Sequence, residues 1–207
     1  MKKLLHIIAT PRGGESNTLK VSEVFLDKFR KNHPDWRIED LDLSEEKLPS
    51  LTAKRVDGKY MLLSGKDLSS DVRESWKEII VRIEQFTSAD IYLISAPMWN
   101  FSIPYTLKHY LDVIMQPGYL FHYTSSGPEG LLKNKKVFVI TSRGGDYSAE
   151  PAKKADFQEP YLRFILGFSG ITDITFINAE PMNMGEELQK KSIQTAMEKA
   201  KSAATAS

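Results

Sequence analysis

Short apolar runs recur along the chain, and most of them stop at a loop of polar residues or glycine. An apolar run of this length, closed by a turn signal, is typical of a strand buried on both faces of a parallel sheet. One run differs, because Trp36 and Ile38 alternate with charged residues and indicate a half-buried strand. The predicted strands lie at residues 4–9, 36–43, 91–96, 137–141 and 174–177.

Between these strands, apolar residues return at the spacing of an amphipathic helix. The predicted helices run from about residue 16 to before Pro34, from 71 to about 86, and over 104–115, 161–168 and 186–204. Strands that alternate with helices predict a parallel sheet with right-handed crossovers and helices on both faces. We therefore expect an α/β fold of three layers in one domain, residues 1–207, with five strands in the order 2-1-3-4-5. Residues 44–70 are a polar stretch that the pattern leaves open as part helix and part excursion.

Composition and charge narrow the class of protein. The chain has 207 residues, of which 41% are hydrophobic and 27% charged, and a net charge of +1. This balance is ordinary for a globular domain and gives no reason to expect nucleic acid as a partner. The absence of Cys excludes disulfides, Cys nucleophiles and iron–sulfur clusters. The apolar start is too short for a signal peptide and no stretch suits a bilayer, so we expect a cytoplasmic protein without membrane contact.

The loop from Thr10 to Thr18 joins the first predicted strand to the first predicted helix and is rich in hydroxyl groups and glycine. Backbone N–H groups and hydroxyls at a helix start bind phosphate, and the helix dipole adds about 0.3–2 kcal/mol. The loop matches neither the Walker A motif nor the three spaced glycines of a dinucleotide site. It is either a phosphate site or a solvated loop in which Ser16 caps the helix.

Residues 97–101, Pro-Met-Trp-Asn-Phe, follow the strand predicted at 91–96. In an open α/β sheet, ligands bind just beyond the carboxyl ends of the strands. Met98 and Trp99 can cover the face of a flat ring, and Asn100 can reach its polar edge. The alternative is an ordinary turn with an aromatic plug.

Two further segments have two interpretations each. Ser142-Arg143-Gly144-Gly145 follows the strand at 137–141, and paired glycines there allow either close approach to a ligand or a plain turn. The outer side of the helix at 104–115 is unusually aromatic, with Tyr105, His109, Tyr110 and Asp112. It predicts either a subunit interface or a contact with the rest of the same chain.

Four segments in this order resemble one family. They are residues 96–101 (Ala-Pro-Met-Trp-Asn-Phe), 127–131 (Gly-Pro-Glu-Gly-Leu), 140–145 (Ile-Thr-Ser-Arg-Gly-Gly) and 167–173 (Gly-Phe-Ser-Gly-Ile-Thr-Asp). Together they resemble the bacterial FMN-dependent NADH-azoreductases, also described as FMN-dependent NADH:quinone oxidoreductases, which have a flavodoxin-like fold. The resemblance extends over nearly the whole chain.

The resemblance implies a homodimer with one FMN per subunit at the subunit interface. By residue, it implies a phosphate held by Thr10, Ser16, Asn17 and Thr18, and an isoalloxazine ring lined by Met98, Trp99, Asn100 and Phe101 and bracketed by Ser142, Arg143, Gly144 and Gly145. Trp99 stands where the family commonly has Tyr, so a phenol hydrogen bond is lost. Residues 11–14 depart from the family loop, which leaves Arg12 open as a phosphate partner or a solvent-facing side chain. Residues 44–70 vary in such proteins and are expected to shape substrate entry.

The implied reaction is a two-electron, ping-pong hydride transfer from NADH or NADPH to quinones or aromatic azo compounds. The flavin carries the redox chemistry, so no acid–base side chain is assigned, and the four His show no metal-site spacing. His122 and Tyr123 are expected near the mouth of the site, as lining. One alternative is a flavodoxin-type one-electron carrier, but such carriers are typically strongly acidic and this chain is not. Another is a phosphate- or nucleotide-binding regulator without a redox role.

Overall fold

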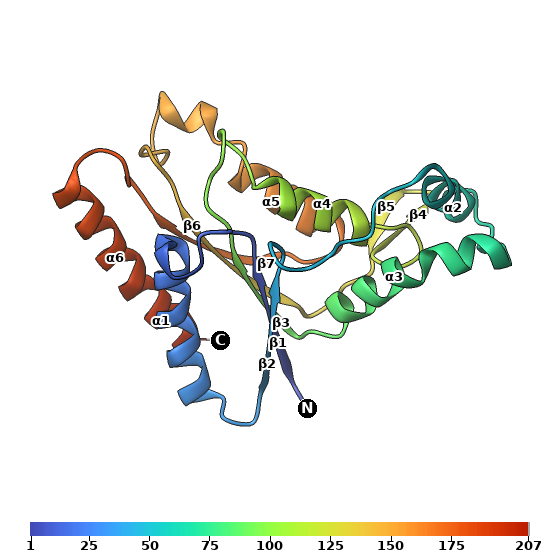
Figure 1. Ribbon diagram of the computed structural model, residues 1–207, viewed down its shortest axis with the longest axis horizontal. Coiled ribbons are helices and arrows are strands. Elements are labelled where there is room, and N and C mark those ends of the chain that lie inside the picture. The colour runs from blue at the N-terminus through green and yellow to red at the C-terminus, as the bar shows by residue number, and fades with distance from the viewer. Residues whose placement is uncertain (207) are drawn as a thin grey trace.

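Five parallel strands form the centre of the molecule, in the spatial order β2-β1-β3-β6-β7 (Figure 1). This computed structural model describes residues 1–206. The strands are β1 (Lys3–Ile8), β2 (Arg37–Asp42), β3 (Ile91–Ser95), β6 (Lys136–Ser142) and β7 (Asp173–Ala179). Once the two strands of a separate hairpin are left out of the numbering, this order is the predicted 2-1-3-4-5.

Helices cover both faces of the sheet, as predicted (Figure 1). One face carries α1 (Asn17–Asn32) and α6 (Glu186–Thr205), and the other carries α3 (Ser70–Thr87), α4 (Tyr105–Ile114) and α5 (Glu159–Phe168). Successive β1 residues supply the two cores, since Leu4 packs on the α1 side and Leu5 on the other. Among the described residues, none of the helices combines the length and the hydrophobicity that crossing a bilayer requires.

Two features differ from the predictions, and one segment that the pattern left open takes a definite structure. Residues 44–70 contain a helix, α2 (Ala53–Leu63), which packs on α3 through Gly58 and Trp76. A two-stranded hairpin of β4 (Phe121–Thr124) and β5 (Gly127–Gly130) was not expected as a sheet, because glycine and proline are poor strand formers. Tyr110, predicted on the outer side of its helix, is buried in the core against Phe86. The two remaining segments are short 3₁₀ helices, η1 (Gly13–Glu15) and η2 (Ala152–Ala155).

Two of the glycine motifs touch each other. A Cβ atom placed on Gly130 would lie 2.1 Å from the backbone nitrogen of Gly170 and 2.3 Å from the carbonyl carbon of Ser169. Leu132 N–H also donates to Ser169 O at 2.9 Å. The hairpin is therefore held against the end of α5 by direct backbone contact, which only glycine permits at position 130.

We expect Gly130→Ala to lower the free energy of unfolding by about 1–3 kcal/mol, the usual cost of overpacking. The reason is that the rigid backbone beside Gly130 cannot move away from the added methyl group. Gly167→Ala is the matched control, since a Cβ there meets open space on α5 and alanine favours a helix by about 0.5–1 kcal/mol. Denaturant melts of both variants check this, and equal stabilities would contradict the contact.

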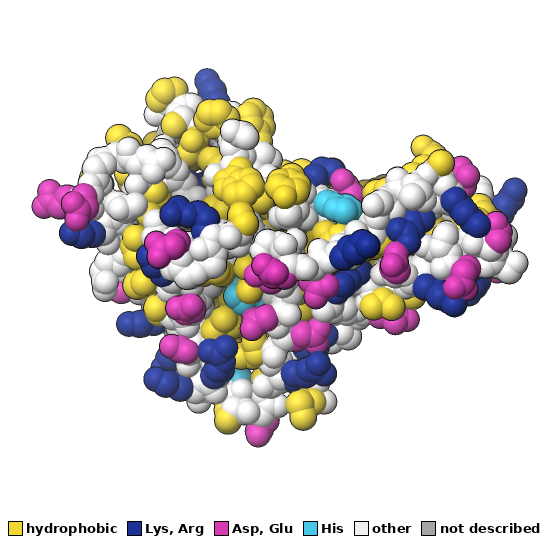
Figure 2. All heavy atoms as spheres, viewed as in Figure 1, with side chains coloured by type: hydrophobic (Ala, Val, Ile, Leu, Met, Phe, Trp, Pro, Cys, Tyr) yellow, Lys and Arg dark blue, Asp and Glu magenta, His cyan; other side chains and the backbone are white. Residues whose placement is uncertain are grey.

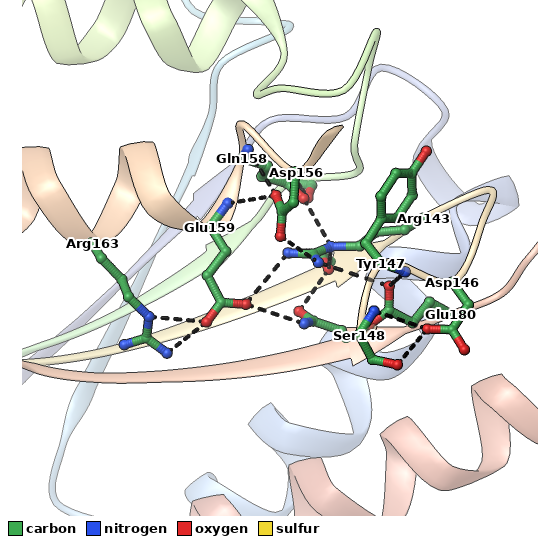
Figure 3. A network of polar contacts seen from close by, with 12 residues as sticks. Arg143, Asp146, Tyr147, Ser148, Asp156, Gln158, Glu159, Arg163 and Glu180 are labelled. Carbon is green, nitrogen blue, oxygen red and sulfur yellow. Dashed lines mark hydrogen bonds and ion pairs between the residues drawn. The ribbon is translucent and has the colours of Figure 1, made fainter. Parts of the chain in front are cut away.

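A buried ionic cluster fastens the segment that follows β6. Arg143 is only 2% exposed, and Asp156 and Glu180 direct their carboxylates toward it, at 3.0 and 3.8 Å from Nη1 (Figure 3). Glu159 lies 3.6 Å from Arg143 Nη2 and also accepts from the exposed Arg163. Burial raises the pKa of Glu180, although the Tyr147 N–H and Arg143 oppose this. One cation thus joins β6, α5 and the end of β7.

The cluster reaches the loop after β3 through Gln158. Arg143 Nε donates to Gln158 Oε1 at 3.2 Å, and Gln158 Nε2 donates to the carbonyls of Ala96 and Pro97, both at 3.1 Å. The neighbouring Phe157 N–H donates to Phe101 O at 2.9 Å. These bonds set the backbone path of residues 96–101.

Replacing Arg143 by methionine should cost about 3–5 kcal/mol of stability, because the buried carboxylates lose their cation. Arg163→Met is the control, since Arg163 is 47% exposed and a surface pair contributes only about 0–1 kcal/mol. The cost at Arg143 should shrink as the pH falls and the carboxylates become neutral. Urea melts at neutral and acid pH measure both effects, and similar losses in the two variants would rule out a special role for the buried cluster.

Candidate functional site

The start of α1 forms a cradle of hydroxyl groups. Ser16 is the N-cap, and its oxygen accepts from Leu19 N–H and from Thr10 Oγ1, both at 3.3 Å. Within residues 1–206 the Ser16 hydroxyl donates to no side chain or carbonyl, so its proton is free for an anion. Thr10 and Thr18 are buried beside it, and Asn17 begins the helix, partly exposed. The predicted N-cap is present, and it is compatible with phosphate binding by the same loop.

Arg12 is exposed at the entrance of η1. Its side chain makes no hydrogen bond or ion pair with the part of the chain that the structure describes. The structure therefore leaves its side chain available without assigning it a ligand.

The loop after β3 holds a tight two-residue turn. Trp99 and Ser102 exchange both backbone hydrogen bonds at 2.9 Å, and the residues between them, Asn100 and Phe101, have φ values of 47° and 68°. Positive φ at both central positions is the geometry of a type I′ turn, which Asn tolerates and Phe rarely adopts. The turn exposes Phe101, while Met98 and Trp99 stay partly buried. Strain of this kind concentrates where a protein binds ligands.

Ser142 joins the three predicted loops. Its Oγ lies 2.7 Å from Thr18 Oγ1 on α1, and its carbonyl accepts from Met98 N–H at 2.9 Å. One step further along the edge, Ala9 N–H donates to Ser95 O at 2.9 Å. The segments 10–18, 97–101 and 142–145 therefore meet at one edge of the sheet, as the strand order predicts.

The residues after Ser142 have different roles. The Arg143 guanidinium lies in the buried cluster, its N–H donates to Ala179 O, and its carbonyl accepts from Met182 N–H. The sequence interpretation of Arg143 as a flavin contact therefore finds a side chain already engaged elsewhere. Gly144 and Gly145 keep N–H groups that donate to no acceptor within the described residues, so they can serve a ligand. Gly144 also packs on Asn183, which a Cβ atom would approach to 2.9 Å.

Two hollows flank a wall made by Trp99, Tyr105 and His109. One has a volume of about 640 Å³ and reaches Leu51 and Tyr161. The other, of about 340 Å³, lies toward the ends of β1 and β2 and is lined by residues that include Pro11, Leu43 and Leu48. The wall is braced where His109 Nε2 meets Pro49 O at 3.1 Å. Segment 44–70 thus borders both hollows, in keeping with the expectation that it shapes entry.

Hydrophobic side chains gather over this edge of the molecule (Figure 2). The exposed Phe101, Tyr105 and Phe157 belong to its segments. The hairpin with His122 and Tyr123 lies well apart from the α1 loop in Figure 1, beside α2. His122 contacts Glu129 of its own hairpin at 3.5 Å and lines neither hollow. The hairpin of the same subunit therefore does not bring His122 to these two hollows, and its place near the mouth of the site stays a prediction.

Sequence reasoning missed two contributors to the site. Gln158 carries the Arg143 cluster to the loop after β3, and no local pattern marks it. His6, with Ser95 and Ser22, forms a buried polar line beneath α1. Its only signal was a polar residue inside each of two apolar strands.

Known proteins are similar to this chain over nearly its whole length. Residues 2–204 match the family described as having a flavodoxin-like fold. An FMN-dependent NADH:quinone oxidoreductase of Clostridium beijerinckii is 42% identical over 205 residues, 99% of this chain and 98% of that protein. One of Desulfotalea psychrophila is 39% identical over 197 residues, 95% of this chain and 93% of that protein.

A solved structure is similar over its full length. It is an FMN-dependent NADH-azoreductase from Bacillus anthracis in complex with FMN, with a TM-score of 0.89 at 27% identity, covering 100% of this chain and 99% of that one. The predicted family is thereby confirmed. With its cradle at α1, its strained turn after β3 and these relatives, the chain belongs to the flavodoxin-like family of FMN-dependent NADH:quinone oxidoreductases.

Proposed function

We propose that this chain is an FMN-dependent oxidoreductase that uses NADH to reduce quinones and aromatic azo compounds. The observation that carries the proposal is the meeting of three loops at Ser142, which places a phosphate cradle beside an aromatic turn. The relatives named above act on quinones, and the solved neighbour is an azoreductase that binds FMN. The choice between NADH and NADPH rests on those names.

The cradle suits the FMN phosphate. Thr10, Ser16, Asn17 and Thr18 would hold it, since the Ser16 proton is free and the first N–H groups of α1 point out of the helix. A single cradle of this kind accommodates one phosphate group. This supports FMN rather than a dinucleotide flavin.

The edge of the sheet suits the flavin ring. Met98, Trp99, Asn100 and Phe101 would line it, and the free N–H groups of Gly144 and Gly145 would face its polar edge. Bound FMN would supply the redox chemistry, accepting hydride from NADH and passing two electrons to the acceptor in a second step at the same place. The chain's own part is to orient the reactants and to offer fixed N–H dipoles to developing negative charge. No side chain is assigned as acid or base.

The assembly proposed is a homodimer of single-domain subunits. Its support is the set of large apolar side chains exposed around the site: Phe101, Tyr105 and Phe157. Exposed apolar surface of this extent is typical of an interaction site. The flanking hollows would then take the acceptor between subunits. The cytoplasmic location stays a prediction.

A one-electron carrier is the competing function. Carriers of that kind dock on their partners through strong charge, whereas this chain has a net charge of +1. The relatives are named as NADH-dependent reductases rather than carriers. The enzyme is therefore the better supported of the two functions.

The purified protein should be yellow and carry one FMN per chain, bound without a covalent link. Heat release followed by mass spectrometry and absorbance measures identity and stoichiometry. Finding FAD, or no binding after reconstitution with FMN, would sink the proposed function.

The Asn100 side chain should contribute to flavin binding. Asn100→Ala removes the amide and also disfavours the positive φ, whereas Asn100→Gly removes the amide and keeps the turn. We expect both variants to weaken FMN binding by about 1–3 kcal/mol, the cost of an unpaired polar group. His122→Ala on the hairpin is the control and should bind FMN like the parent. If Asn100→Gly binds FMN like the parent, the backbone of the turn alone determines FMN affinity and the proposed amide contact is wrong.

A further inference from the structure

A line of polar groups, buried except for the 59% exposed Asp40 at its end, runs beneath the first turn of α1. His6, 4% exposed, meets the Asp40 carboxylate through Nδ1 at 2.9 Å and the Ser95 hydroxyl through Nε2 at 2.7 Å. The Ser95 Oγ lies 2.6 Å from Ser22 Oγ, which donates to the Thr18 carbonyl at 3.0 Å. We call these five groups the His6 chain. It crosses from β2 through β1 and β3 to α1.

The order Asp40, His6, Ser95 has the connectivity of a nucleophilic triad, but the surroundings exclude that role. Ser95 has no exposed surface, and its oxygen is enclosed between His6 and Ser22. A nucleophile needs a reacting atom about 3 Å away in an accessible position. The His6 chain is therefore not a hydrolytic site.

The hydrogen bonds of the His6 chain need one more proton than its two hydroxyl groups carry. Three successive hydrogen bonds join Nε2 to Ser95, Ser95 to Ser22, and Ser22 to the Thr18 carbonyl, and each of them needs one proton. The two hydroxyls supply only two. The third must be on Nε2. The hydrogen bond from His6 holds the pKa of Asp40 below its ordinary value, so that carboxylate accepts and Nδ1 must donate. With every contact satisfied, the His6 ring carries both protons and a positive charge.

The charges around His6 are few. Asp40 comes from β2, and Arg30 of α1 acts on that carboxylate while pairing with Asp27. The groups that touch His6 from β3, and that continue the chain into α1, are neutral hydroxyls. The His6 chain thus links the buried His6 ring to α1.

The far end of the chain lies in the phosphate cradle. The hydrogen bond that Ser22 donates to the Thr18 carbonyl polarises the peptide group between Thr18 and Leu19. This strengthens the Leu19 N–H as a donor. That N–H donates to Ser16, which also accepts from Thr10 and keeps its own proton for an anion. Without a proton on Nε2, one of the three contacts of the His6 chain is no longer a hydrogen bond.

We propose that His6 is a positioning residue for the cofactor phosphate, acting through Ser95 and Ser22 on the first turn of α1. This inference rests on the proposed function. Because the proton that the His6 chain requires and a bound phosphate favour each other, phosphate binding takes up a proton, and phosphate affinity falls as the pH rises. The second ionisation of the phosphate itself, near pH 6, acts in the opposite direction, since affinity rises as the dianion forms.

The test compares two flavins on the apoprotein between pH 6.5 and 9, by quenching of flavin fluorescence. FMN carries the phosphate and riboflavin does not, so the ratio of their affinities isolates the phosphate contribution. In the parent protein this ratio should fall by about fivefold or more as the pH rises. In Ser22→Ala, which cuts the chain and leaves His6 in place, it should stay nearly flat.

His6→Asn should also flatten the ratio, and Ser22→Ala keeps the test decisive if that variant fails to fold. As an independent readout, the ¹⁵N signals of the His6 ring should report a proton on both ring nitrogens when FMN is bound. Equal pH dependence in parent and Ser22→Ala, with FMN still bound, would overturn this inference and leave the proposed function intact. Absence of binding of either flavin to the parent would overturn both.

Discussion

The hydrogen bonds of Ser142 hold the site together. Parallel strands all end at one edge of the sheet, but the loops that leave them are free to diverge. The contact between Ser142 Oγ and Thr18 Oγ1 fixes the start of α1 against β6, and the Met98 N–H on the Ser142 carbonyl fixes the loop after β3 to the same point. A phosphate cradle and an aromatic turn therefore keep a constant separation, which a cofactor with a phosphate at one end and a ring at the other requires.

Two buried polar side chains support this edge from opposite sides. Arg143 sits among carboxylates on the α5 side and transmits its position through Gln158 to the backbone of residues 96–97. His6 lies on the α1 side and acts through hydroxyls on the cradle. Both side chains are almost fully buried. Both hold backbone and hydroxyl groups of the site's loops in place, which is how a preorganised site keeps its dipoles fixed.

The turn at Asn100 and Phe101 shows what such support makes possible. Positive φ at a bulky residue is unfavourable by about 1–3 kcal/mol and persists only where the surroundings over-determine it. Here the Trp99–Ser102 pair closes the turn, and Phe157 N–H holds the Phe101 carbonyl. The result is an exposed phenyl ring at the rim of the site, beside the Trp99 wall that separates the two hollows.

The sequence by itself determined the strand order, the helices on both faces and the three loops that meet. Apolar periodicity is local, and right-handed crossovers leave few topologies for alternating strands and helices. Only the tertiary structure decided where side chains within those loops turn. Arg143 was expected at the flavin and lies among Asp156, Glu159 and Glu180, because the carboxylates that capture it come from segments far along the chain. For the same reason the sequence did not predict the hairpin, since its glycine-rich strand β5 depends on pairing with β4. Nor did it predict the hydrogen bond between His6 and Ser95, which lie 89 positions apart.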